Sequence, residues 1–431
     1  MDYKEALDYI NDKNKYGSRL GLESVGRLLE HLGNPHLGLN YIHVAGTNGK
    51  GSTSSYLAHT IKEAGYKVGL YTSPYLERFN ERIQINGVDI PDEALGRITG
   101  EVKKAADKMV EEGMLHPTTF EIITAVAFVY YKEENVDYVV LEVGLGGRFD
   151  STNIIEKSLA SVITTLDYDH IAELGDTLGK IAYQKAGIIK ENGLVISYPQ
   201  EEEALLVLKD VANEMNAEFI LTPVENIIIK EESEFGSTFD YEFMGNILKD
   251  IKISLIGEYQ IYNASLAITT LLVLREKGLI DISDEEIYRG VFNTKWKGRL
   301  EVLKRKPTFL IDGAHNVQGI THLAKAIKLF NYKNLILGVG ILKDKDVDHM
   351  VELLAPMADK IIVTEVNMPR KLAAEELAEK IRKYNANDIY IEKDIRKAID
   401  KAFEIAHEED LIVFGGSLYL IGEVRTLVNL L

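Results

Sequence analysis

The chain contains no cysteine. This absence excludes disulfide bonds, thiol nucleophiles and zinc sites built from thiolates. A metal ion bound by this chain must therefore be held by oxygen atoms or by histidine, and that requirement favours Mg²⁺.

Long apolar runs are missing as well, and none approaches the roughly 18 residues that a membrane-spanning helix needs. The N-terminal stretch MDYKEALDYI carries acidic residues where a signal peptide would carry basic and then apolar ones. We therefore expect a cytoplasmic protein without a membrane partner.

Basic residues are outnumbered by acidic ones. The 49 Lys and Arg residues against 67 Asp and Glu residues give a formal net charge of -18. Because binding to a phosphate backbone draws on a concentrated basic surface, and the basic residues here are scattered, no nucleic-acid partner is expected. A small anionic ligand would need a local pocket of backbone amides, lysines or metal ions.

Proline is scarce, with nine residues in 431, and no run rich in Ser or Gly marks a linker. A chain of this length exceeds one ordinary core, and its 46% of hydrophobic residues can fill two. We expect a domain boundary near residue 296. The joint should be short and the two domains closely apposed.

Apolar stretches alternate with amphipathic helical segments in the N-terminal half. Strands are predicted in YKVGLYTS, VDYVVLEVG, LASVITTL and GLVISYP, and helices over 51–64, 118–133 and 176–189. This alternation predicts an α/β fold with a mostly parallel sheet and helices on both faces. A smaller αβ series follows residue 296, with strands predicted in TFLIDGAHN, NLILGVG, KIIVTEV, DIYIEKD and DLIVFGG.

The segment from about 224 to 256 has short alternating strands and few helix formers, which predicts a small antiparallel excursion at one edge. Helices are predicted over 259–277 and 284–293. The stretch NTKWKGRLEVL follows and contains the only tryptophan.

The stretch HVAGTNGKGSTSS, residues 43–55, lies between a predicted strand and a predicted helix. Its glycines let backbone amides turn toward a phosphate at the helix N-terminus, Lys50 can reach the outer phosphates, and Ser52 or Thr53 can bind Mg²⁺. The register differs from the common phosphate loop, because Val44 replaces its first glycine and Gly51 separates Lys50 from Ser52. An ordinary glycine-rich turn is the alternative.

Polar residues end or follow the neighbouring predicted strands. Glu142 ends a run typical of a buried parallel strand, where an unpaired carboxylate is costly and calls for a metal or cation. Ser73 and His170 follow two other strands. Because the carboxyl ends of parallel strands meet at one rim, these residues and the glycine-rich loop should converge. A structural salt bridge at Glu142 and a plain hydrogen-bonded loop position for His170 are the alternatives.

Lys185 lies in a predicted helix that enters the apolar segment of IAYQKAGIIK. Buried lysines lose their charge readily, and a neutral amine can act as a nucleophile, including toward CO₂. A lysine that extends to solvent is the alternative.

In the second αβ series, Asp312, His315 and Asn316 cluster after a strand in LIDGAHN, and Arg299 follows the tryptophan. An aspartate at a strand end can accept hydrogen bonds from ribose hydroxyls, and an arginine can neutralise a triphosphate. The Gly-x-Gly of GVGILKD is weak evidence for a dinucleotide site and is interpreted as a turn.

These stretches together resemble one family, the folylpolyglutamate synthases and dihydrofolate synthases of the Mur ligase superfamily. The resemblance rests on HVAGTNGKGST, GLYTSPYLERFNERIQING, LEVGLGGRFDSTN, DHIAELGDTLGKIAYQKAGIIK, GEYQIYNASLAI, WKGRLEV, DGAHN and FGGSLYLIGEVR. It covers nearly the whole chain. The glycine between Lys50 and Ser52 is similar to the phosphate loop of this superfamily.

The resemblance implies an ATP-dependent ligase that adds L-glutamate to folates or to dihydropteroate through an acyl phosphate. It implies a P-loop-type ATP-binding domain over 1–295 and a smaller Rossmann-like glutamate ligase domain over 296–431, with ATP between them. The ATP contacts implied by the resemblance are Thr47, Asn48, Gly49, Lys50, Gly51, Ser52, Asn263, Arg299, Asp312 and His315.

The resemblance also implies Mg²⁺, with two ions expected. The metal ligands that it implies are Ser52, Ser73, Glu142, His170 and Lys185. Lys185 would be carbamylated and so become a carboxylate-like ligand. Lys50, His170 and Lys185 are the catalytic residues expected from the resemblance.

The acceptor pocket implied by the resemblance includes Phe120, Arg148 and Asp150. The chain carries Phe149 and Ser151 where relatives often have Leu and Ala. The motifs do not separate dihydropteroate from reduced folates as the acceptor. The family further implies a monomer that acts on small-molecule substrates.

Two alternatives remain at this stage. Another Mur-type amide ligase would share most of these motifs. A regulatory ATPase switch would hydrolyse ATP without acceptor or glutamate, but it would leave the nucleotide contacts of the second domain without a purpose.

Overall fold

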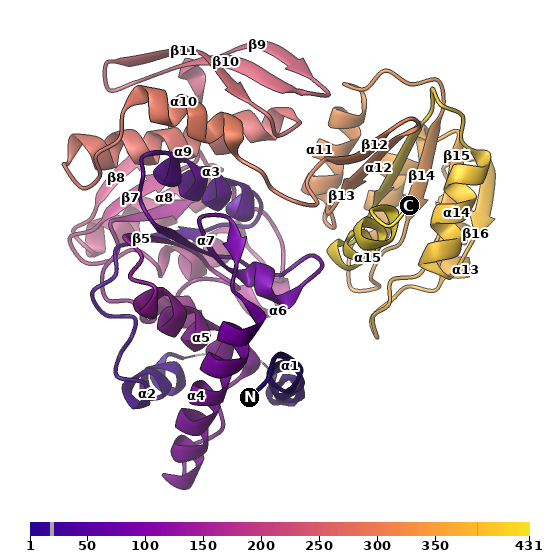
Figure 1. Ribbon diagram of the computed structural model, residues 1–431. Coiled ribbons are helices and arrows are strands. Elements are labelled where there is room, and N and C mark those ends of the chain that lie inside the picture. Colours follow the sequence, from indigo (N-terminus) through magenta and orange to yellow (C-terminus); the bar gives the residue numbers. More distant parts are fainter. Residues whose placement is uncertain (18–20, 386) are drawn as a thin grey trace.

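An eight-stranded sheet forms the centre of the N-terminal part of the computed structural model, which describes residues 1–17, 21–385 and 387–431 (Figure 1). Its strand order is β4-β3-β2-β5-β1-β6-β7-β8, with β3 and β4 antiparallel and the other pairings parallel. The strands are β1 (Tyr41–Ala45), β2 (Val68–Tyr71), β3 (Ile83–Ile85), β4 (Val88–Asp89), β5 (Tyr138–Glu142), β6 (Ala160–Ile163), β7 (Leu194–Ser197) and β8 (Glu218–Leu221).

Helices cover both faces of this sheet, which confirms the expected α/β fold. The helices of this part are α1 (Tyr3–Asp12), α2 (Glu23–His31), α3 (Lys50–Glu63), α4 (Asp92–Glu111), α5 (Thr119–Glu133), α6 (Ile171–Leu174), α7 (Leu178–Ala186), α8 (Glu202–Glu214), α9 (Glu258–Glu276) and α10 (Asp284–Asn293). Short 3₁₀ turns are η1 (Lys13–Tyr16), η2 (Phe79–Arg82), η3 (Ser151–Ile154) and η4 (Val224–Asn226).

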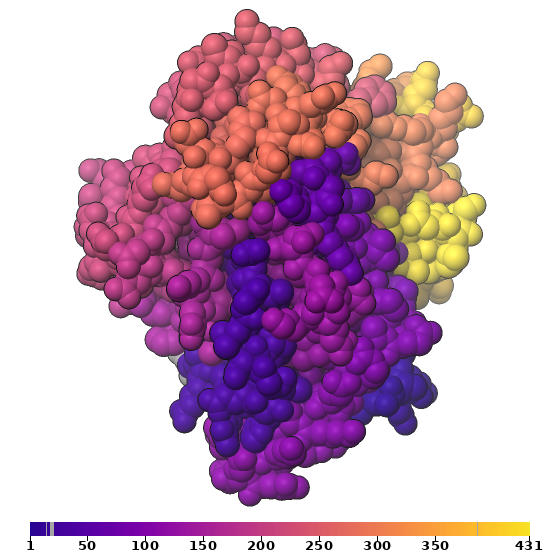
Figure 2. All heavy atoms as spheres, turned by 60° about the vertical axis from the view of Figure 1, so that its left-hand side comes forward, coloured from indigo at the N-terminus to yellow at the C-terminus, as the bar shows by residue number. Residues whose placement is uncertain are grey.

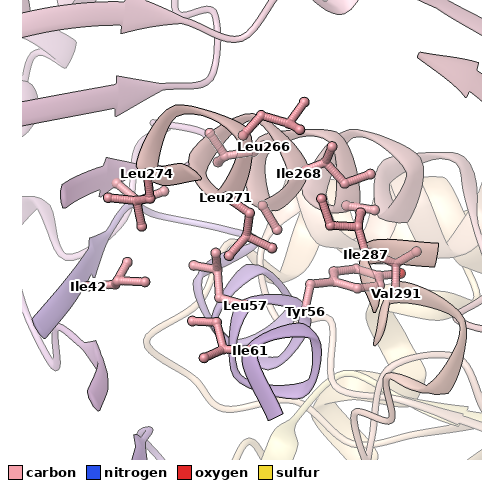
Figure 3. Close-up of a cluster of buried hydrophobic side chains, with 14 of the residues drawn as sticks. Ile42, Tyr56, Leu57, Ile61, Leu266, Ile268, Leu271, Leu274, Ile287 and Val291 are labelled. Atoms are coloured by element: carbon pink, nitrogen blue, oxygen red, sulfur yellow. The ribbon is translucent and has the colours of Figure 1, made fainter. Parts of the chain in front are cut away.

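The core that positions α3 lies between that helix, α9, α10 and one face of the sheet (Figure 3). Tyr56 and Leu57 of α3 meet Leu271 of α9 and Ile287 of α10, and all four side chains are fully buried. Burial of each such side chain contributes about 1.5–3 kcal/mol. The start of α3, where a phosphate is expected, is therefore held firmly against the sheet.

The opposite face is covered in two places. Near β5 and β2 it contacts α5, on which α1, α2 and α4 lie. Near β6 and β7 it is covered by α7 and α8. The sheet is thus buried on both faces, as the continuous apolar runs of its strands predict.

The antiparallel segment predicted over 224–256 is confirmed, and it forms a separate sheet instead of extending the large one. Its strands, in the order β11-β10-β9, are β9 (Ile227–Ser233), β10 (Gly236–Phe243) and β11 (Asn246–Ile253). This small sheet covers α9 and α10 at the top of Figure 1. Its core residues, such as Phe239 and Tyr241, therefore join the core around α3.

The C-terminal part contains a six-stranded sheet with the order β12-β13-β17-β14-β15-β16, parallel except for β12. Its strands are β12 (Glu301–Arg305), β13 (Thr308–Asp312), β14 (Leu335–Val339), β15 (Lys360–Val363), β16 (Asp388–Ile391) and β17 (Leu411–Gly415). Its helices are α11 (Val317–Ile327), α12 (Val347–Leu354), η5 (Ala355–Met357), α13 (Ala374–Ile381), α14 (Ile395–Ile405) and α15 (Leu418–Val428). The helices α11 to α13 cover one face, and α14 and α15 cover the other.

The two parts are joined by residues 294–300, between the end of α10 and the start of β12. The predicted boundary near residue 296 falls within this segment and stays a prediction. Figure 2 shows the C-terminal part, orange to yellow, lying against one side of the N-terminal part. Arg425 of α15 connects the two, because its guanidinium pairs with Glu301 at 2.9 Å and also with Glu77.

All strands predicted from the sequence are present. The prediction missed the short strands β3, β4 and β8 and the antiparallel β12. Among the described residues, no helix is long and apolar enough to cross a lipid bilayer.

Candidate active site

Strand β1 leads directly into the glycine-rich loop, and α3 begins at Lys50. Gly49 is the N-cap residue of α3, with a φ of 84°, and no side chain of the described residues caps the helix. The first backbone amides of α3 are therefore left without a side-chain acceptor. A helix N-terminus of this kind attracts phosphate through its amides and its dipole.

Three glycines of the loop have no room for a side chain, and at Gly46 a Cβ atom would lie 1.7 Å from the hydroxyl oxygen of Thr164. A Cβ atom at Gly49 would lie 2.5 Å from Oδ1 of Asn263, and one at Gly51 would lie 2.4 Å from Cζ2 of Trp296. Gly49 also has the left-handed backbone conformation that favours glycine. The glycine between Lys50 and Ser52, unusual by the common pattern, thus makes room for the tryptophan of the joint.

The end of strand β6 fixes the shape of the loop. The backbone N–H of Thr47 donates to the carbonyl of Thr165 at 2.8 Å, and its hydroxyl donates to the carbonyl of Asp167 at 3.0 Å. The hydroxyl of Thr164 donates to the carbonyl of Asn48 at 2.7 Å. These bonds leave the side chain of Asn48 free to turn away from the N-terminal part.

That side chain contacts the C-terminal part. The amide nitrogen of Asn316 donates to Oδ1 of Asn48 at 3.1 Å, and Nδ2 of Asn48 donates to Oε1 of Gln318. Asn316 is also the N-cap of α11, because its Oδ1 accepts a bond from the backbone of Gly319 at 2.8 Å. One residue of the glycine-rich loop is therefore bound to the N-terminus of a helix in the other part.

Lys50 folds back over its own loop. Its ammonium group donates to the carbonyls of Gly46, at 3.1 Å, and Thr47, at 3.2 Å. Ser52 is buried, and its hydroxyl oxygen accepts a bond from Nε2 of Gln260 at 3.2 Å. Lys50 makes no ion pair among the described residues, so its charge is available to an anionic ligand.

A cavity of about 850 Å³ opens in front of this loop. Most of the predicted ATP and metal residues line it, namely Thr47, Asn48, Gly49, Lys50, Gly51, Ser52, Ser73, Glu142, His170, Lys185, Arg299 and His315. They come from the ends of β2, β5, β1 and β6, which are neighbours in the sheet, from α7, which carries Lys185, and from the start of the C-terminal part. We expected these residues to converge because they follow the carboxyl ends of parallel strands. The adjacent positions of β2, β5, β1 and β6 in the sheet explain why they do.

Glu142 is 3% exposed, and its Oε2 accepts a bond from the backbone N–H of Ser73 at 3.0 Å. Burial raises the pKa of this carboxyl to about 6, although the charge of Lys50 acts in the opposite direction. Within the described part of the chain Glu142 has no ion-pair partner. A buried carboxylate in this position is a strong candidate for a cation ligand.

Lys185 is 4% exposed, and its amine donates to the carbonyl of Gly46 at 2.7 Å. Burial, together with the positive charge of Lys50, lowers the pKa of this amine to about 7. The extended, solvent-facing alternative for Lys185 is therefore wrong. A substantial fraction of the amine is neutral near pH 7.

His170 has a left-handed backbone, with a φ of 48°, and its side chain is half exposed. Its Nε2 lies 3.8 Å from Oδ2 of Asp169, whose other oxygen accepts a bond from Lys345 of the C-terminal part at 3.3 Å. Burial lowers the pKa of His170, while the charge of Asp169 raises it. His170 is the N-cap residue of the short helix α6, and it lines the cavity from that position.

Arg299 and His315 bring the C-terminal part to the cavity wall. Arg299 has no hydrogen bond or ion pair to any described residue. Nδ1 of His315 lies 2.8 Å from the carbonyl of Gly313, and burial together with the charge of Arg299 lowers the pKa of the imidazole to about 4. A neutral imidazole that donates from Nδ1 presents an acceptor nitrogen at Nε2.

Two predicted ATP residues, Asn263 and Asp312, are not on the wall of either cavity. Asn263 is buried and donates to Oε1 of Gln260 at 3.2 Å. The carboxylate of Asp312 accepts bonds from the backbone of Leu300, at 2.9 Å, and Ala314, at 2.8 Å. Both side chains lie behind the segments that do line the cavity.

A second cavity, of about 820 Å³, adjoins the first. The residues that line both are Ser73, Pro74, Gly144, Leu145, Gly146, His170, Leu174, His315 and Leu418. The predicted acceptor residues Phe120 and Asp150 lie on the wall of this second cavity. Arg148 does not, because its guanidinium lies 4.0 Å above the ring of Tyr183.

Sequence reasoning missed several residues of the second cavity, among them Arg82, Lys345, Arg370 and Ser417. Arg82 has aromatic neighbours, with its guanidinium 5.1 Å from the ring of Tyr75. Lys345 and Ser417 follow β14 and β17, so the rule that ligands gather at strand ends, applied to the C-terminal sheet, would have found them.

No three His, Asp or Glu side chains come together as a ready-made metal site in the ranges that the structure describes. Glu142 nevertheless shares its cavity wall with the hydroxyls of Ser52 and Ser73. Mg²⁺ is commonly held by one or two carboxylates together with water and phosphate oxygens instead of by a protein cage. The residues present therefore fit Mg²⁺ that arrives with a nucleotide.

Two family models match the chain. The Mur ligase middle domain matches residues 44–271, and the Mur ligase glutamate ligase domain matches residues 298–418. The glycine-rich loop lies at the start of the first match, and Arg299 lies at the start of the second.

Individual proteins match the chain over nearly its whole length. A dihydrofolate synthase/folylpolyglutamate synthase of Bacillus subtilis (strain 168) is 36% identical over 98% of each chain. A Mycobacterium tuberculosis folylpolyglutamate synthase solved with ADP has a TM-score of 0.90 at 28% identity, covering 99% of both chains. An Escherichia coli protein solved with DHPP and ADP has a TM-score of 0.88 at 28% identity, covering 100% of this chain and 98% of that one.

Proposed function

This chain belongs to the folylpolyglutamate synthase/dihydrofolate synthase family of Mur-type ligases, and from that premise we propose that it joins L-glutamate to the carboxylate of a folate-type acceptor with consumption of ATP. The observation that carries the proposal is that the two cavities share one set of residues. ATP would occupy the cavity beside the glycine-rich loop. The acceptor and glutamate would occupy the adjoining one, so that the reacting groups meet where the cavities join.

ATP would be bound by the residues of the loop and by the C-terminal part. Asn263 and Asp312 would act from behind the wall, Asn263 beneath Gly49 and Asp312 through the backbone beside Arg299. Residues 1–295 would then form the ATP-binding domain and residues 296–431 the glutamate ligase domain. Relatives solved with ADP support this part of the proposal.

Mg²⁺ would be held by Glu142, with Ser52, Ser73 and His170 around it, and two ions are expected. When bound, the ion neutralises the charge of the phosphoryl group during its transfer. Glu142 supports this assignment because it is a buried carboxylate without an ion pair to any described residue.

Lys185 would carry a carbamate and serve as a further metal ligand. An ammonium group there would repel a cation, whereas a carbamate reverses the sign of the charge. Carbamylation requires a neutral amine. The amine nitrogen attacks the carbon of CO₂ and then loses a proton. The lowered pKa of about 7 supports this step, because the neutral amine is already populated at neutral pH.

The chemistry follows from the inertness of a carboxylate toward amines. Its carbon is a poor electrophile and its oxygen a poor leaving group. Transfer of the γ-phosphoryl group of ATP to the acceptor carboxylate gives ADP and an acyl phosphate. The amine of glutamate then attacks the acyl carbon, phosphate leaves and the amine nitrogen loses a proton.

The residues of this chain would lower the barriers of both steps. Lys50 and Arg299 both line the cavity and would place positive charge where negative charge develops on the transferred phosphoryl group. Closure of the two parts over the cavity would exclude the water that would otherwise hydrolyse the acyl phosphate.

The proposal is tested by measuring ADP release with Mg²⁺, an acceptor and an amino acid varied one at a time. We expect release only when a folate-type acceptor, L-glutamate and Mg²⁺ are all present. Dihydropteroate and tetrahydrofolate, tested separately, decide which ligations occur. Rapid ADP release without glutamate would favour a regulatory ATPase switch, and activity with other acceptors or amino acids would favour another Mur-type ligase.

We further propose that the chain acts in the cytoplasm as a monomer on small-molecule substrates, without nucleic acid or a membrane. The net charge of -18 and the scattered basic residues support the absence of a nucleic-acid partner. Light scattering coupled to size-exclusion chromatography measures the mass in solution, and a mass of twice 48.3 kDa would contradict the monomer.

A further inference from the structure

His43 lies in the middle of β1, three residues before the glycine-rich loop, and it is completely buried. Neither cavity wall includes it. Its Nε2 lies 2.9 Å from the hydroxyl oxygen of Thr152, at the start of η3. Its Nδ1 has no hydrogen-bond partner among the described residues. Buried polar atoms are usually hydrogen-bonded, so a buried histidine in which only one ring nitrogen has a partner needs an explanation.

Thr152 connects His43 to Asp150. The hydroxyl of Thr152 donates to Oδ1 of Asp150 at 2.5 Å, and its backbone N–H donates to the same oxygen at 3.0 Å. The other oxygen of Asp150 accepts a bond from the backbone of Leu145 at 2.9 Å. The backbone of Gly144 also donates to this carboxylate, so several donors from the chain surround it.

The direction of the hydrogen bonds follows from the number of protons. The single hydroxyl proton of Thr152 is directed at Asp150, so the hydroxyl oxygen must accept from His43. Nε2 of His43 then carries the proton, and Nδ1 is unprotonated, which agrees with its lack of an acceptor. Burial lowers the pKa of His43 well below its usual range, and the charge of Lys190 acts in the same direction, so the ring is neutral.

Asp150 is the end of this chain of hydrogen bonds, and it lies on the wall of the second cavity. It is 7% exposed and has no ion-pair partner within the described ranges. Burial raises its pKa, while the bonds from Thr152 and Leu145 favour the charged form. The carboxylate thus depends on neutral donors for its stability and its orientation.

Residues 153–155, which follow Thr152, are also held by hydrogen bonds from polar side chains. The ammonium group of Lys190 donates to Oδ1 of Asn153 at 2.8 Å and to the carbonyl of Ile155 at 2.5 Å. Nδ2 of Asn153 donates to the carbonyls of Arg148, at 3.1 Å, and Gly187, at 2.9 Å. A buried polar network therefore fixes this whole stretch of the cavity wall.

We infer that His43 and Thr152 are positioning residues that hold the carboxylate of Asp150 toward the acceptor cavity, where it receives hydrogen bonds from N–H groups of the acceptor. The inference rests on the proposed function, because it assigns the second cavity to the acceptor. His43 and Thr152 act only through Asp150, since neither reaches a cavity. The strand that carries the glycine-rich loop for ATP thereby also orients a group for the acceptor.

Thr152→Val and Thr152→Ser form a matched pair of variants. Valine keeps the shape of threonine and removes the hydroxyl, whereas serine keeps the hydroxyl. With dihydropteroate or tetrahydrofolate, whichever the wild type uses, we expect Thr152→Val to raise the KM for the acceptor about tenfold. The KM for ATP should change less than about twofold, and Thr152→Ser should restore most of the affinity for the acceptor.

The KM values do not depend on the fraction of folded enzyme, so a partial loss of stability does not imitate this result. His43→Gln and His43→Met test the other end of the chain of hydrogen bonds. Glutamine offers a donor near the position of Nε2, and methionine offers none. We expect the methionine variant to raise the KM for the acceptor and the glutamine variant to raise it less.

A double-mutant cycle with Asp150→Asn decides whether the effect passes through Asp150. We expect Thr152→Val to have little further effect on the KM for the acceptor once Asp150 is asparagine. Fully additive effects would overturn the inference, as would an unchanged KM for the acceptor in Thr152→Val or an equal rise in the KM for ATP. A wild type that releases ADP without any acceptor would instead contradict the proposed function, and with it the basis of this inference.

Discussion

Asn48 of the glycine-rich loop donates a side-chain hydrogen bond to Gln318 of α11, although the two residues lie 270 positions apart in the sequence. A second bond, from Asn316, reaches the same amide. The loop that would hold the phosphates is therefore in contact with the C-terminal part through one side chain. If the two parts move relative to each other, the loop loses both bonds.

Replacing Gln318 by Met keeps the length of the side chain and removes the acceptor for Asn48. We expect kcat to fall about fivefold, the effect of losing one hydrogen bond of about 1 kcal/mol. The ratio of ADP released to amide formed should rise, because a less firmly closed site admits water. Lys325→Met on the exposed side of the same helix serves as the control. If Gln318→Met kept the kcat of the wild type and still formed one amide for each ADP released, the prediction would be contradicted.

Lys50→Ala should abolish most activity while leaving the fold intact. Among the described residues, the ammonium group of Lys50 bonds only to carbonyls of its own loop, so its charge serves mainly the transferred phosphoryl group. We expect kcat/KM to fall by about two to three orders of magnitude. Lys62→Ala, at an exposed site in the last turn of the same helix, should be active. Circular dichroism of both variants checks the fold, and normal turnover in a folded Lys50→Ala protein rules out the role.

Arg299→Ala and Asp312→Ala should both weaken the use of ATP, for different reasons. Arg299 faces the cavity without a partner among the described residues, so its loss should raise the KM for ATP with little change in unfolding temperature. Asp312 holds the backbone of Leu300 and Ala314. Its loss leaves two buried amides unpaired and should also lower stability, by about 1–3 kcal/mol. Wild-type ATP kinetics in both variants would show that the site between the two parts is misassigned.

Lys185 makes the stability of the unmodified protein depend on pH. Its pKa is about 7 in the folded protein and about 10.4 in an unfolded chain. Between these values the unfolded state binds the additional proton, so the free energy of unfolding rises with pH, by on the order of 1 kcal/mol per pH unit. Lys185→Met lacks this contribution. In buffer free of CO₂, urea denaturation should show that the free energy of unfolding of Lys185→Met exceeds that of the wild type by less at pH 10 than at pH 7. A difference that stays constant over this range would argue against a buried, neutral amine.

Lys185→Ala tests the proposed carbamate directly. We expect it to be nearly inactive and to be partly rescued by acetate or formate, because a small carboxylate can occupy the vacated volume and supply the missing charge. Methylamine, which has a similar size and the opposite charge, is the matched control and should not rescue. A crystal structure with bound metal and an unmodified Lys185 turned to solvent would end this idea.

The α/β fold could be predicted because its strands are short apolar runs between amphipathic helices, and such patterns are local. The same locality explains what was missed. The three-residue strand β3 forms by pairing with β2, the two-residue strand β4 forms by pairing with β3, and no periodicity in the sequence marks either of them. The strands over 227–253 were found as antiparallel, but their separation from the large sheet depends on how they pair in space.

The candidate site divides in the same way. Lys50, Glu142 and Lys185 stand out in the sequence because a charged residue in an apolar or glycine-rich context is costly without a role. His43 does not stand out, because its hydrogen-bond partner Thr152 lies in η3, 109 positions further along the chain, and only the folded structure brings the two together. The bonds from Asn48 to Gln318 and from Arg425 to Glu77 join residues hundreds of positions apart, and no local rule predicts them.

The contact between Gly51 and Trp296 gives this molecule an optical reporter of its own. Trp296 is the only tryptophan in the chain, its ring lies against the glycine of the phosphate loop, and it belongs to the segment that joins the two parts. Its intrinsic fluorescence therefore reports on a single known position, with no other indole contributing background. A titration with nucleotide, or a stopped-flow record of turnover, can follow the loop and the joint without any attached label.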